Sequence, residues 1–342
     1  MFFLRQFPDP RRLRPLAENA DYRRRFYARW GREHCFVLAA SRGIELPPYT
    51  QRLSVKTVCH GAEHYQFDDR TLLIDEDSYL IVNDGRTYAS RIAADRPVTT
   101  FSIFFAPGFA ESVAGAILSR ARDPLATDAA GERRVPAFSE HLRRHDRLVT
   151  PLLRRIRDRV QQGERDEVWY EEQLVLLLEA LVKSQFRTES DIFRLPFRRP
   201  ATRREVFRRI ARATDYLLGN FRGDIGLEEL AREARLSKYH FIKLFEAVHG
   251  HTPCAFLRRK RATAAMRLLE STRLPQTEVA SLAGFTGRST MYREIRRITG
   301  TSGRRIRAGA LRTDGAAATK RLTPAAGRSS TSSSLPENGA GS

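Results

Sequence analysis

The chain reads LEELAREARLSKYHFIKLF from Leu227 to Phe245 and TEVASLAGFTGRSTMYREI from Thr277 to Ile295. In each stretch, apolar residues recur at helical spacing, a short break follows, and apolar residues then return at helical spacing. One such stretch alone is a weak signal, but here the pattern occurs twice. The two stretches therefore predict two helix-turn-helix units in the last third of the chain.

The first stretch predicts a helix whose outer face is free to touch a partner. Ser237 is a good N-cap for this helix, and Phe241, Leu244 and Phe245 face inward at i, i+3 and i+4. The residues left facing out are Lys238, Tyr239, Ile242 and Lys243. The second helix of a helix-turn-helix enters the major groove of DNA, so these side chains are placed to meet a duplex.

The second stretch repeats this design with different side chains. Gly284 supplies the left-handed turn residue at little cost. Met291 and Ile295 belong to the inner face of the following helix. The residues that project away from it are Arg288, Ser289, Tyr292 and Arg293.

A helix from Pro253 to Glu270 is predicted between the two units, and it carries the basic run Arg258-Arg259-Lys260-Arg261. A helix of about 15 residues is about 22 Å long. With the width of the units added, the two recognition helices are expected roughly one DNA turn apart, about 34 Å. One chain would then reach two successive major grooves.

These features together resemble the AraC/XylS family of regulators over about residues 207–308. The residues that carry the resemblance are Ala231, Ser237, Phe241, Phe245, Gly250, Pro253, Arg261, Leu268, Leu269, Ala280, Gly284 and Phe285. The resemblance implies a sequence-specific transcription regulator in which the outward residues of both recognition helices contact bases: Tyr239, Ile242 and Lys243, then Arg288, Ser289, Tyr292 and Arg293. Arg235 departs from the pattern, since the family often has glycine at this turn position.

The N-terminal half has a different pattern. Short segments rich in β-branched and aromatic residues are separated by the turn residues Pro47-Pro48, Asp68-Asp69 and Asn83-Asp84-Gly85. The predicted strands are Cys35–Ala39, Leu53–His60, Thr71–Ile74, Ser78–Val82 and Val98–Phe105, which favour a small barrel or sandwich. Helices are predicted at 138–161 and 168–186, the second being the most apolar and a candidate for either a domain core or a dimer seam. The region 61–88 loosely resembles the cupin-like sensor domains of the same family.

The chain carries a formal charge of +20, which favours polyanionic partners. Residues 201–312 contain 24 Lys and Arg against 10 Asp and Glu, a net charge of +14. No run of about 18 apolar residues occurs, so no membrane span is expected. The three cysteines match no zinc pattern, and the N-terminus does not resemble a secretory signal, so a cytoplasmic protein is expected.

The predicted fold is an α+β multidomain chain, with an N-terminal cupin-like β-barrel sensor that has a helical extension and a C-terminal all-α double helix-turn-helix domain. The predicted parts are a basic N-terminal segment at 1–34, a sensor and dimerisation domain at 35–190, a linker at 191–204, the DNA-binding domain at 205–308 and a disordered tail at 313–342. The expected partners are double-stranded DNA, a small-molecule effector, a second copy of the chain in a homodimer and, for an activator, RNA polymerase.

Further site residues follow from residue chemistry. Phosphate contacts are expected from Ser237, Lys238, Arg258 and Arg259, whereas Arg288 and Arg293 match the O6/N7 edge of guanine. The predicted effector-binding residues, all polar-tipped, are Tyr49, His60, His64, Tyr65 and Tyr88. No metal or other cofactor is expected, because His60 and His64 would stand about 13 Å apart on a single strand.

Three alternatives to a transcription regulator are a DNA-modifying or repair enzyme, an architectural DNA-binding protein and an enzyme in the sensor domain, which only observed turnover would support. Cys254 lies beside a basic helix, as a repair nucleophile could, but no histidine–acid partner is evident near it. We therefore expect no enzyme activity. An architectural protein would show weak sequence preference, which two base-reading helices argue against.

Overall fold

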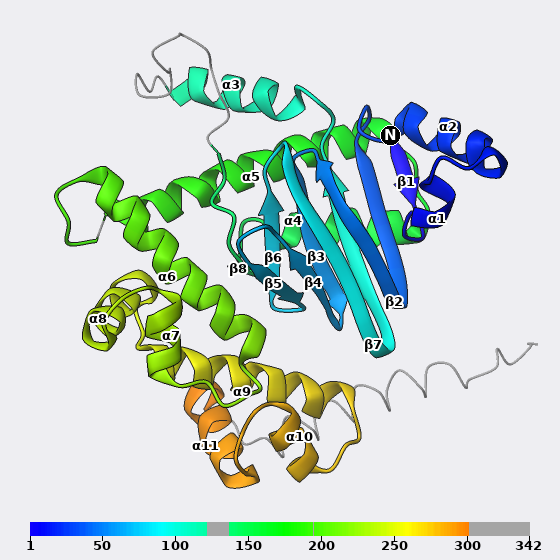
Figure 1. Ribbon diagram of the computed structural model, residues 1–342. Helices are drawn as coiled ribbons and strands as arrows, with labels where there is room; N and C mark the ends of the chain where they lie inside the picture. The colour runs from blue at the N-terminus through cyan, green and yellow to red at the C-terminus, as the bar shows by residue number, and fades with distance from the viewer. Residues whose placement is uncertain (122–136, 194, 301–342) are drawn as a thin grey trace, which may run out of the picture. The chain divides into compact units, whose positions relative to one another are not determined.

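A computed structural model of the chain describes residues 1–121, 137–193 and 195–300 (Figure 1). It consists of two compact units, Met1–Leu257 and Arg258–Ser342. The predicted tail at 313–342 lies outside the described residues. The chain thus has mixed α and β content, with its sheet in the first unit.

The first unit is organised around two long antiparallel strands, β2 (Cys35–Gln51) and β7 (Arg86–Phe104). Their register runs from Cys35 opposite Phe104 to Gln51 opposite Arg86. The other strands of this eight-stranded sheet are β1 (Phe2–Leu4), β3 (Ser54–His60), β4 (Ala62–Gln66), β5 (Thr71–Asp75), β6 (Ser78–Val82) and β8 (Arg143–Arg144). The main order is β1-β2-β7-β3-β6-β8, with β4 paired to β5 and β7. Among the described residues this pairing does not return to its start, so the sheet is not closed as a cupin-like barrel would be.

Successive side chains of a strand point to opposite sides of the sheet, and both sides carry buried residues. Strand β6 shows this clearly: Leu80 and Val82 belong to one apolar cluster, and Tyr79 and Ile81 belong to another. Helices α4 (Thr150–Gln162) and α5 (Glu167–Phe193) supply residues to the second cluster. Helix α6 (Pro200–Asn220) supplies residues to the first.

Three further helices lie early in the first unit: α1 (Pro10–Leu13), α2 (Ala20–Arg29) and α3 (Phe109–Ala121). Helix α2 lies within the predicted basic N-terminal segment at 1–34. No helix in the described part of the chain is long and apolar enough to cross a membrane.

Several predicted boundaries were wrong. The helix expected at 138–161 begins only at Thr150, and its predicted first turns contain β8 instead. Strand β2 continues through Pro47-Pro48, which was expected to be a turn. The prolines occupy a register irregularity between Leu46 and Tyr49, where a missing N–H donor is tolerated.

The predicted linker at 191–204 overlaps two helices, since α5 extends to Phe193 and α6 begins at Pro200. The remaining helices are α7 (Leu227–Glu233), α8 (Lys238–His249), α9 (Pro253–Ser271), α10 (Gln276–Leu282) and α11 (Arg288–Thr299). The boundary between the two compact units falls within α9.

Candidate nucleic-acid interface

The first helix-turn-helix consists of α7 and α8, as the sequence predicted. Leu230, Ala231, Phe241 and Phe245 are buried between the helices. The turn is held by two backbone hydrogen bonds, from the Leu236 N–H to the Ala231 carbonyl at 3.0 Å and from the Arg235 N–H to the Arg232 carbonyl at 2.9 Å. These contacts fix the turn between α7 and α8.

The outward face of α8 carries the expected side chains. Tyr239 is 72% exposed, Lys243 is exposed and Ile242 is half-buried. Lys238 is also exposed and forms an ion pair of 2.6 Å with the exposed Glu228. Exposed pairs of this kind contribute little free energy, so Lys238 can exchange Glu228 for a phosphate at small cost.

Ser237 occupies the N-cap position of α8, but its hydroxyl makes no side-chain cap to the helix backbone. It instead shares a hydrogen bond of 2.9 Å with Nδ1 of His240. The position of the cap was thus predicted correctly, whereas the bond it makes was not.

The second helix-turn-helix consists of α10 and α11, and its turn repeats the first in backbone detail. The Phe285 N–H donates to the Ala280 carbonyl at 2.8 Å, and the Gly284 N–H donates to the Ser281 carbonyl at 2.9 Å. Gly284 has φ +81, the left-handed conformation that the sequence predicted. The buried residues of this unit's own cluster include Val279, Ala280, Met291 and Ile295.

The outward face of α11 is basic. Arg288, Ser289 and Arg293 are exposed, whereas Tyr292 is half-buried against the apolar cluster of this unit. Arg293 makes no ion pair with Glu278, Glu294 or any other described residue.

Glu294 is an anchor that the sequence analysis missed. Its side chain is 9% exposed and pairs with Arg258 at 3.6 Å and with Arg297 at 3.0 Å. Arg258, expected to contact phosphate, thus ties α9 to α11, and Arg259 beside it is half-buried. Within the expected basic run, Lys260 is only 3% exposed. In the sequence, Glu294 is an acidic residue among the arginines of this helix, and this interruption of the basic pattern was the available signal.

Three of the five predicted effector-binding residues come together inside the sheet unit. The rings of Tyr49 and Tyr65 have centroids 5.2 Å and 5.5 Å from that of Tyr88. The Tyr65 hydroxyl donates to Oε2 of Glu63 at 2.9 Å. The result is a buried polar cluster in an otherwise apolar core.

Two buried charged residues in this cluster were not predicted, because Lys and Glu are usually exposed. Lys56 and Glu63 are each 2% exposed. Burial lowers the pKa of Lys56 to about 7 and raises the pKa of Glu63. The Lys56 ammonium lies 3.5 Å from the ring centroid of Phe104, a cation–π contact.

The two histidines lie apart from the tyrosines. They are on successive strands, β3 and β4, which both pair antiparallel with β7 and so run in the same direction. Gly61, with φ +88, lies between the two strands. The His60 side chain is 79% exposed, and Nδ1 lies 4.0 Å from Glu76. The described residues contain no group of three side chains able to hold a metal ion.

Residues 230–309 match a family model described as a helix-turn-helix domain. The sequence is similar to a probable transcriptional regulator, LumQ, of Photobacterium leiognathi, with 32% identity over 88 residues, 26% of this chain and 36% of that protein. It is also similar to the HTH-type transcriptional regulator Rv1931c of Mycobacterium tuberculosis, with 35% identity over 88 residues, 25% of this chain and 34% of that protein. The chain thus spans about a third of the length of these relatives.

The chain is also similar to a number of solved structures. The DNA-binding domain of AdpA, in complex with a target DNA, matches with 29% identity and a TM-score of 0.28, covering 29% of this chain and 90% of that one. ToxT of Vibrio cholerae matches with 10% identity and a TM-score of 0.32, covering 79% and 97%.

The doubled turn and the family match define a helix-turn-helix domain in the last third of the chain. More narrowly, it is an AraC-type helix-turn-helix domain, as the sequence resemblance implied.

Proposed function

We propose that the protein is a sequence-specific, double-stranded DNA-binding transcription regulator whose activity is controlled by a small-molecule effector. The observation that carries this proposal is the pair of helix-turn-helix units with the same turn hydrogen bonds, each presenting an exposed basic face on its second helix. Two such units in one chain fit two adjacent major grooves.

The exposed residues divide into two roles. Arg288 and Arg293 suit the O6/N7 edge of guanine, since a guanidinium donates two parallel hydrogen bonds. Tyr239 and Ile242 would supply apolar contact to thymine methyl groups. Lys238 lies at the start of α8, where its charge meets phosphate and sets the register without reading sequence.

The sheet unit is proposed to be the sensor that binds the effector. Its sheet is open in the described residues, so it would do so as a cupin-like domain without a closed barrel. Homodimerisation belongs to the same proposal, supported by the exposed apolar side chains that α5 presents: Val168, Leu176, Phe186 and Phe193. The proposal also includes a cytoplasmic location, no enzyme activity and, if the protein is an activator, contact with RNA polymerase.

The test is a set of binding titrations with the full chain. A preferred duplex is first selected from a random pool. Arg293→Ala is expected to weaken binding to that duplex by about 1–3 kcal/mol and to relax preference at one base position. Lys238→Ala is expected to weaken preferred and scrambled duplexes equally and to lower the salt slope by about one unit.

Arg154→Ala is the matched control, because it removes one exposed charge from α4, outside both helix-turn-helix units. It should leave binding unchanged. If selection yields no preferred sequence, the architectural alternative replaces the proposal. If Arg293→Ala weakens both duplexes equally, Arg293 does not read bases.

A further inference from the structure

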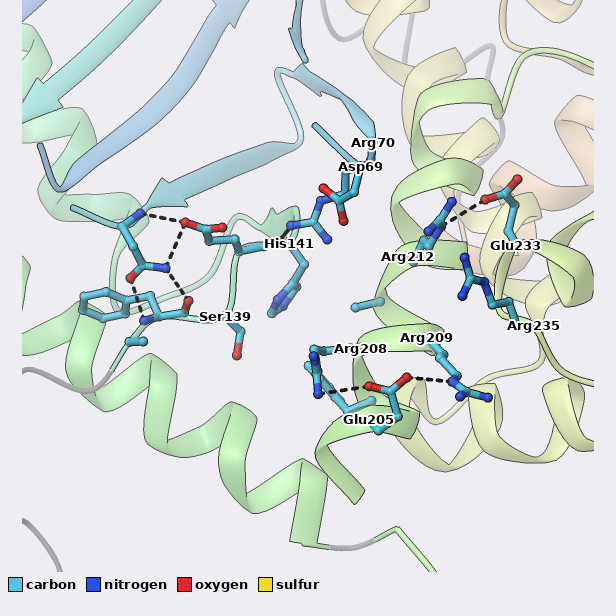
Figure 2. A pocket seen from close by; sticks show the side chains of 16 residues that line it. Asp69, Arg70, Ser139, His141, Glu205, Arg208, Arg209, Arg212, Glu233 and Arg235 are labelled. Carbon is cyan, nitrogen blue, oxygen red and sulfur yellow. Dashed lines mark hydrogen bonds and ion pairs between the residues drawn. The ribbon is translucent and has the colours of Figure 1, made fainter. Parts of the chain in front are cut away.

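An arginine-lined groove lies between the sheet and the first helix-turn-helix, and three of its arginines have acid partners (Figure 2). Arg208 and Arg209 pair with Glu205 at 3.0 Å and 2.9 Å. Arg212 pairs with Glu233 at 3.3 Å. Much of the charge in this groove is therefore balanced within the chain, which is not the case for the arginines of α4.

One side of α4 forms the wall of an open groove of about 750 Å³. The side chains on this wall include Arg154, Arg155, Asp158, Arg159 and Gln162, and Trp169 of α5 lines the same groove. Steps of three and four residues place these α4 residues on one side of the helix. The stripe they form is about 12 Å long, at a rise of about 1.5 Å per residue.

Two arginines of the stripe have no acid partner. Arg154 is exposed and forms no ion pair with any described residue. Arg155 is also exposed, and its Nη1 donates to the neutral side-chain oxygen of Gln173 at 3.3 Å. Asp158, on the same stripe, pairs with Arg157 at 2.6 Å. The stripe therefore keeps a surplus of positive charge.

Two further arginines extend this charge past the end of α4. Arg5 donates from Nη2 to the Gln161 carbonyl at 3.2 Å. The guanidinium of Arg165 lies 4.0 Å from the ring centroid of Phe3. Both arginines are exposed, and neither forms an ion pair with an acid in the part of the chain that the structure describes.

Trp169 adds an aromatic surface to these charges. Its ring is half-buried and lies 4.4 Å from the guanidinium of Arg159. The neighbouring Val168 is 80% exposed. Tryptophan and arginine are the residues most enriched at the energetic centres of protein–protein interfaces, and a guanidinium matches a carboxylate with two parallel hydrogen bonds.

The acids of this surface favour a protein partner over nucleic acid. Asp158 lies on the stripe, and Glu164, which pairs with Arg159, lies at its end. A phosphate backbone is charged at every step and would meet these carboxylates, whereas a polypeptide can turn uncharged residues toward them. A two-fold contact through this face is also disfavoured, because it would bring the same arginines of two copies together.

We propose that this basic face of α4, defined by Arg154, Arg155, Arg159 and Trp169, is a docking site for an acidic helix of another protein. Carboxylates four residues apart on a helix stand about 6 Å from each other, and Arg155 and Arg159 have the same spacing on α4. A partner helix lying along α4 thus pairs with successive arginines and packs an apolar side chain against Trp169. The inference goes beyond DNA recognition and does not depend on it.

The probe is a labelled synthetic helix of about 18 residues, with glutamate at every fourth position and leucine and alanine between. A matched peptide has glutamine in place of each glutamate. Binding to the full chain is measured by the fluorescence anisotropy of the label. The acidic helix should bind, and the glutamine peptide should bind at least tenfold more weakly, because the charge pairs are lost.

The double variant Arg154→Ala, Arg155→Ala should bind the acidic helix about tenfold more weakly, since each exposed ion pair contributes little and two are removed. The matched control is Arg11→Ala with Arg12→Ala, which removes two adjacent exposed arginines from α1. The reversed variant Arg154→Glu, Arg155→Glu should bind a peptide with lysine in place of glutamate more tightly than wild type does. This gain cannot result from misfolding.

Four results would each overturn the proposal. In the first, the acidic helix does not bind wild type at about 1 mM. In the second, the α4 and α1 double variants bind it equally well. In the third, the α4 double variant loses affinity for duplex DNA, which would make this face a nucleic-acid surface. In the last, sedimentation shows that the α4 double variant turns a dimer into a monomer, which would make the face a contact between copies.

Discussion

Asp215 on α6 gives the first unit a pH dependence that can be isolated by one substitution. Its carboxyl is 3% exposed; Oδ1 accepts the Leu142 N–H at 2.9 Å, and Oδ2 has no hydrogen-bond partner among the described residues. Burial raises its pKa from 3.8 to about 7, although the Leu142 N–H and Arg70 act in the opposite direction.

The sign follows from this raised pKa. The protonated form is favoured in the folded state, so the stabilising contribution of Asp215 is complete below pH 3.8 and is lost as the pH rises through about 7. Each unit of pKa shift is worth about 1.4 kcal/mol. Between pH 5 and pH 8, ionisation of Asp215 alone should lower the free energy of unfolding by about 2–3 kcal/mol.

Asp215→Asn keeps an oxygen for the Leu142 N–H and removes the ionisation. The variant should therefore gain about 2–3 kcal/mol over wild type between pH 5 and pH 8. Both tryptophans, Trp30 and Trp169, belong to the first unit, so their fluorescence during urea unfolding reports on that unit. Asp224→Asn, in the exposed segment between α6 and α7, is the control. A difference between variant and wild type that stays constant from pH 5 to pH 8 would refute the reasoning.

Three further predictions concern the helix-turn-helix units. Gly284→Ala should destabilise the second unit by about 1–2 kcal/mol because of its φ of +81, seen as faster hydrogen exchange in α10 and α11; unchanged exchange would contradict this. Glu294→Gln should weaken the ion pairs with Arg258 and Arg297 and lower the stability of the second unit by about 0.5–1 kcal/mol, measured by the same hydrogen exchange. Unchanged exchange would mean that these ion pairs do not stabilise the unit. Phe245→Ala, fully buried, should cost about 3–5 kcal/mol in urea unfolding, while Tyr239→Ala, 72% exposed, should cost less than about 0.5; equal costs would place Phe245 outside the core.

The helix-turn-helix units could be predicted because their signals are local. The signals of the first unit, including the inward positions of Phe241 and Phe245, lie within residues 227–245, and those of the second, including the turn at Gly284, lie within residues 277–295. A helix needs no distant partner for its hydrogen bonds. The sheet depends on partners far along the chain. The first half of β7, with its polar and charged residues, gave no strand signal and is a strand only because β2 and β4 pair with it.

The arginine-lined groove could not be predicted for a related reason. Its arginines come from the turn before β5, from α6 and from the turn before α8, segments that only the tertiary fold brings together. Asp215 likewise carries no sequence signal of burial, since aspartate is mostly exposed in proteins. Its burial depends on Leu142, a residue in the region where sequence periodicity wrongly predicted a helix.

The pairing of β2 with β7 also sets the order in which the protein can be made. Cys35 finds its partner only when Phe104 has left the ribosome, and β8 joins β6 later still. At about 5–20 residues per second, the apolar start of β2 waits several seconds without its main antiparallel partner during synthesis. That interval exposes a strand edge to other nascent chains, and pairing so distant in sequence is intrinsically slow. The yield of folded protein should therefore depend on translation rate and on chaperones through the sheet, whereas the locally connected helix-turn-helix units should be far less sensitive.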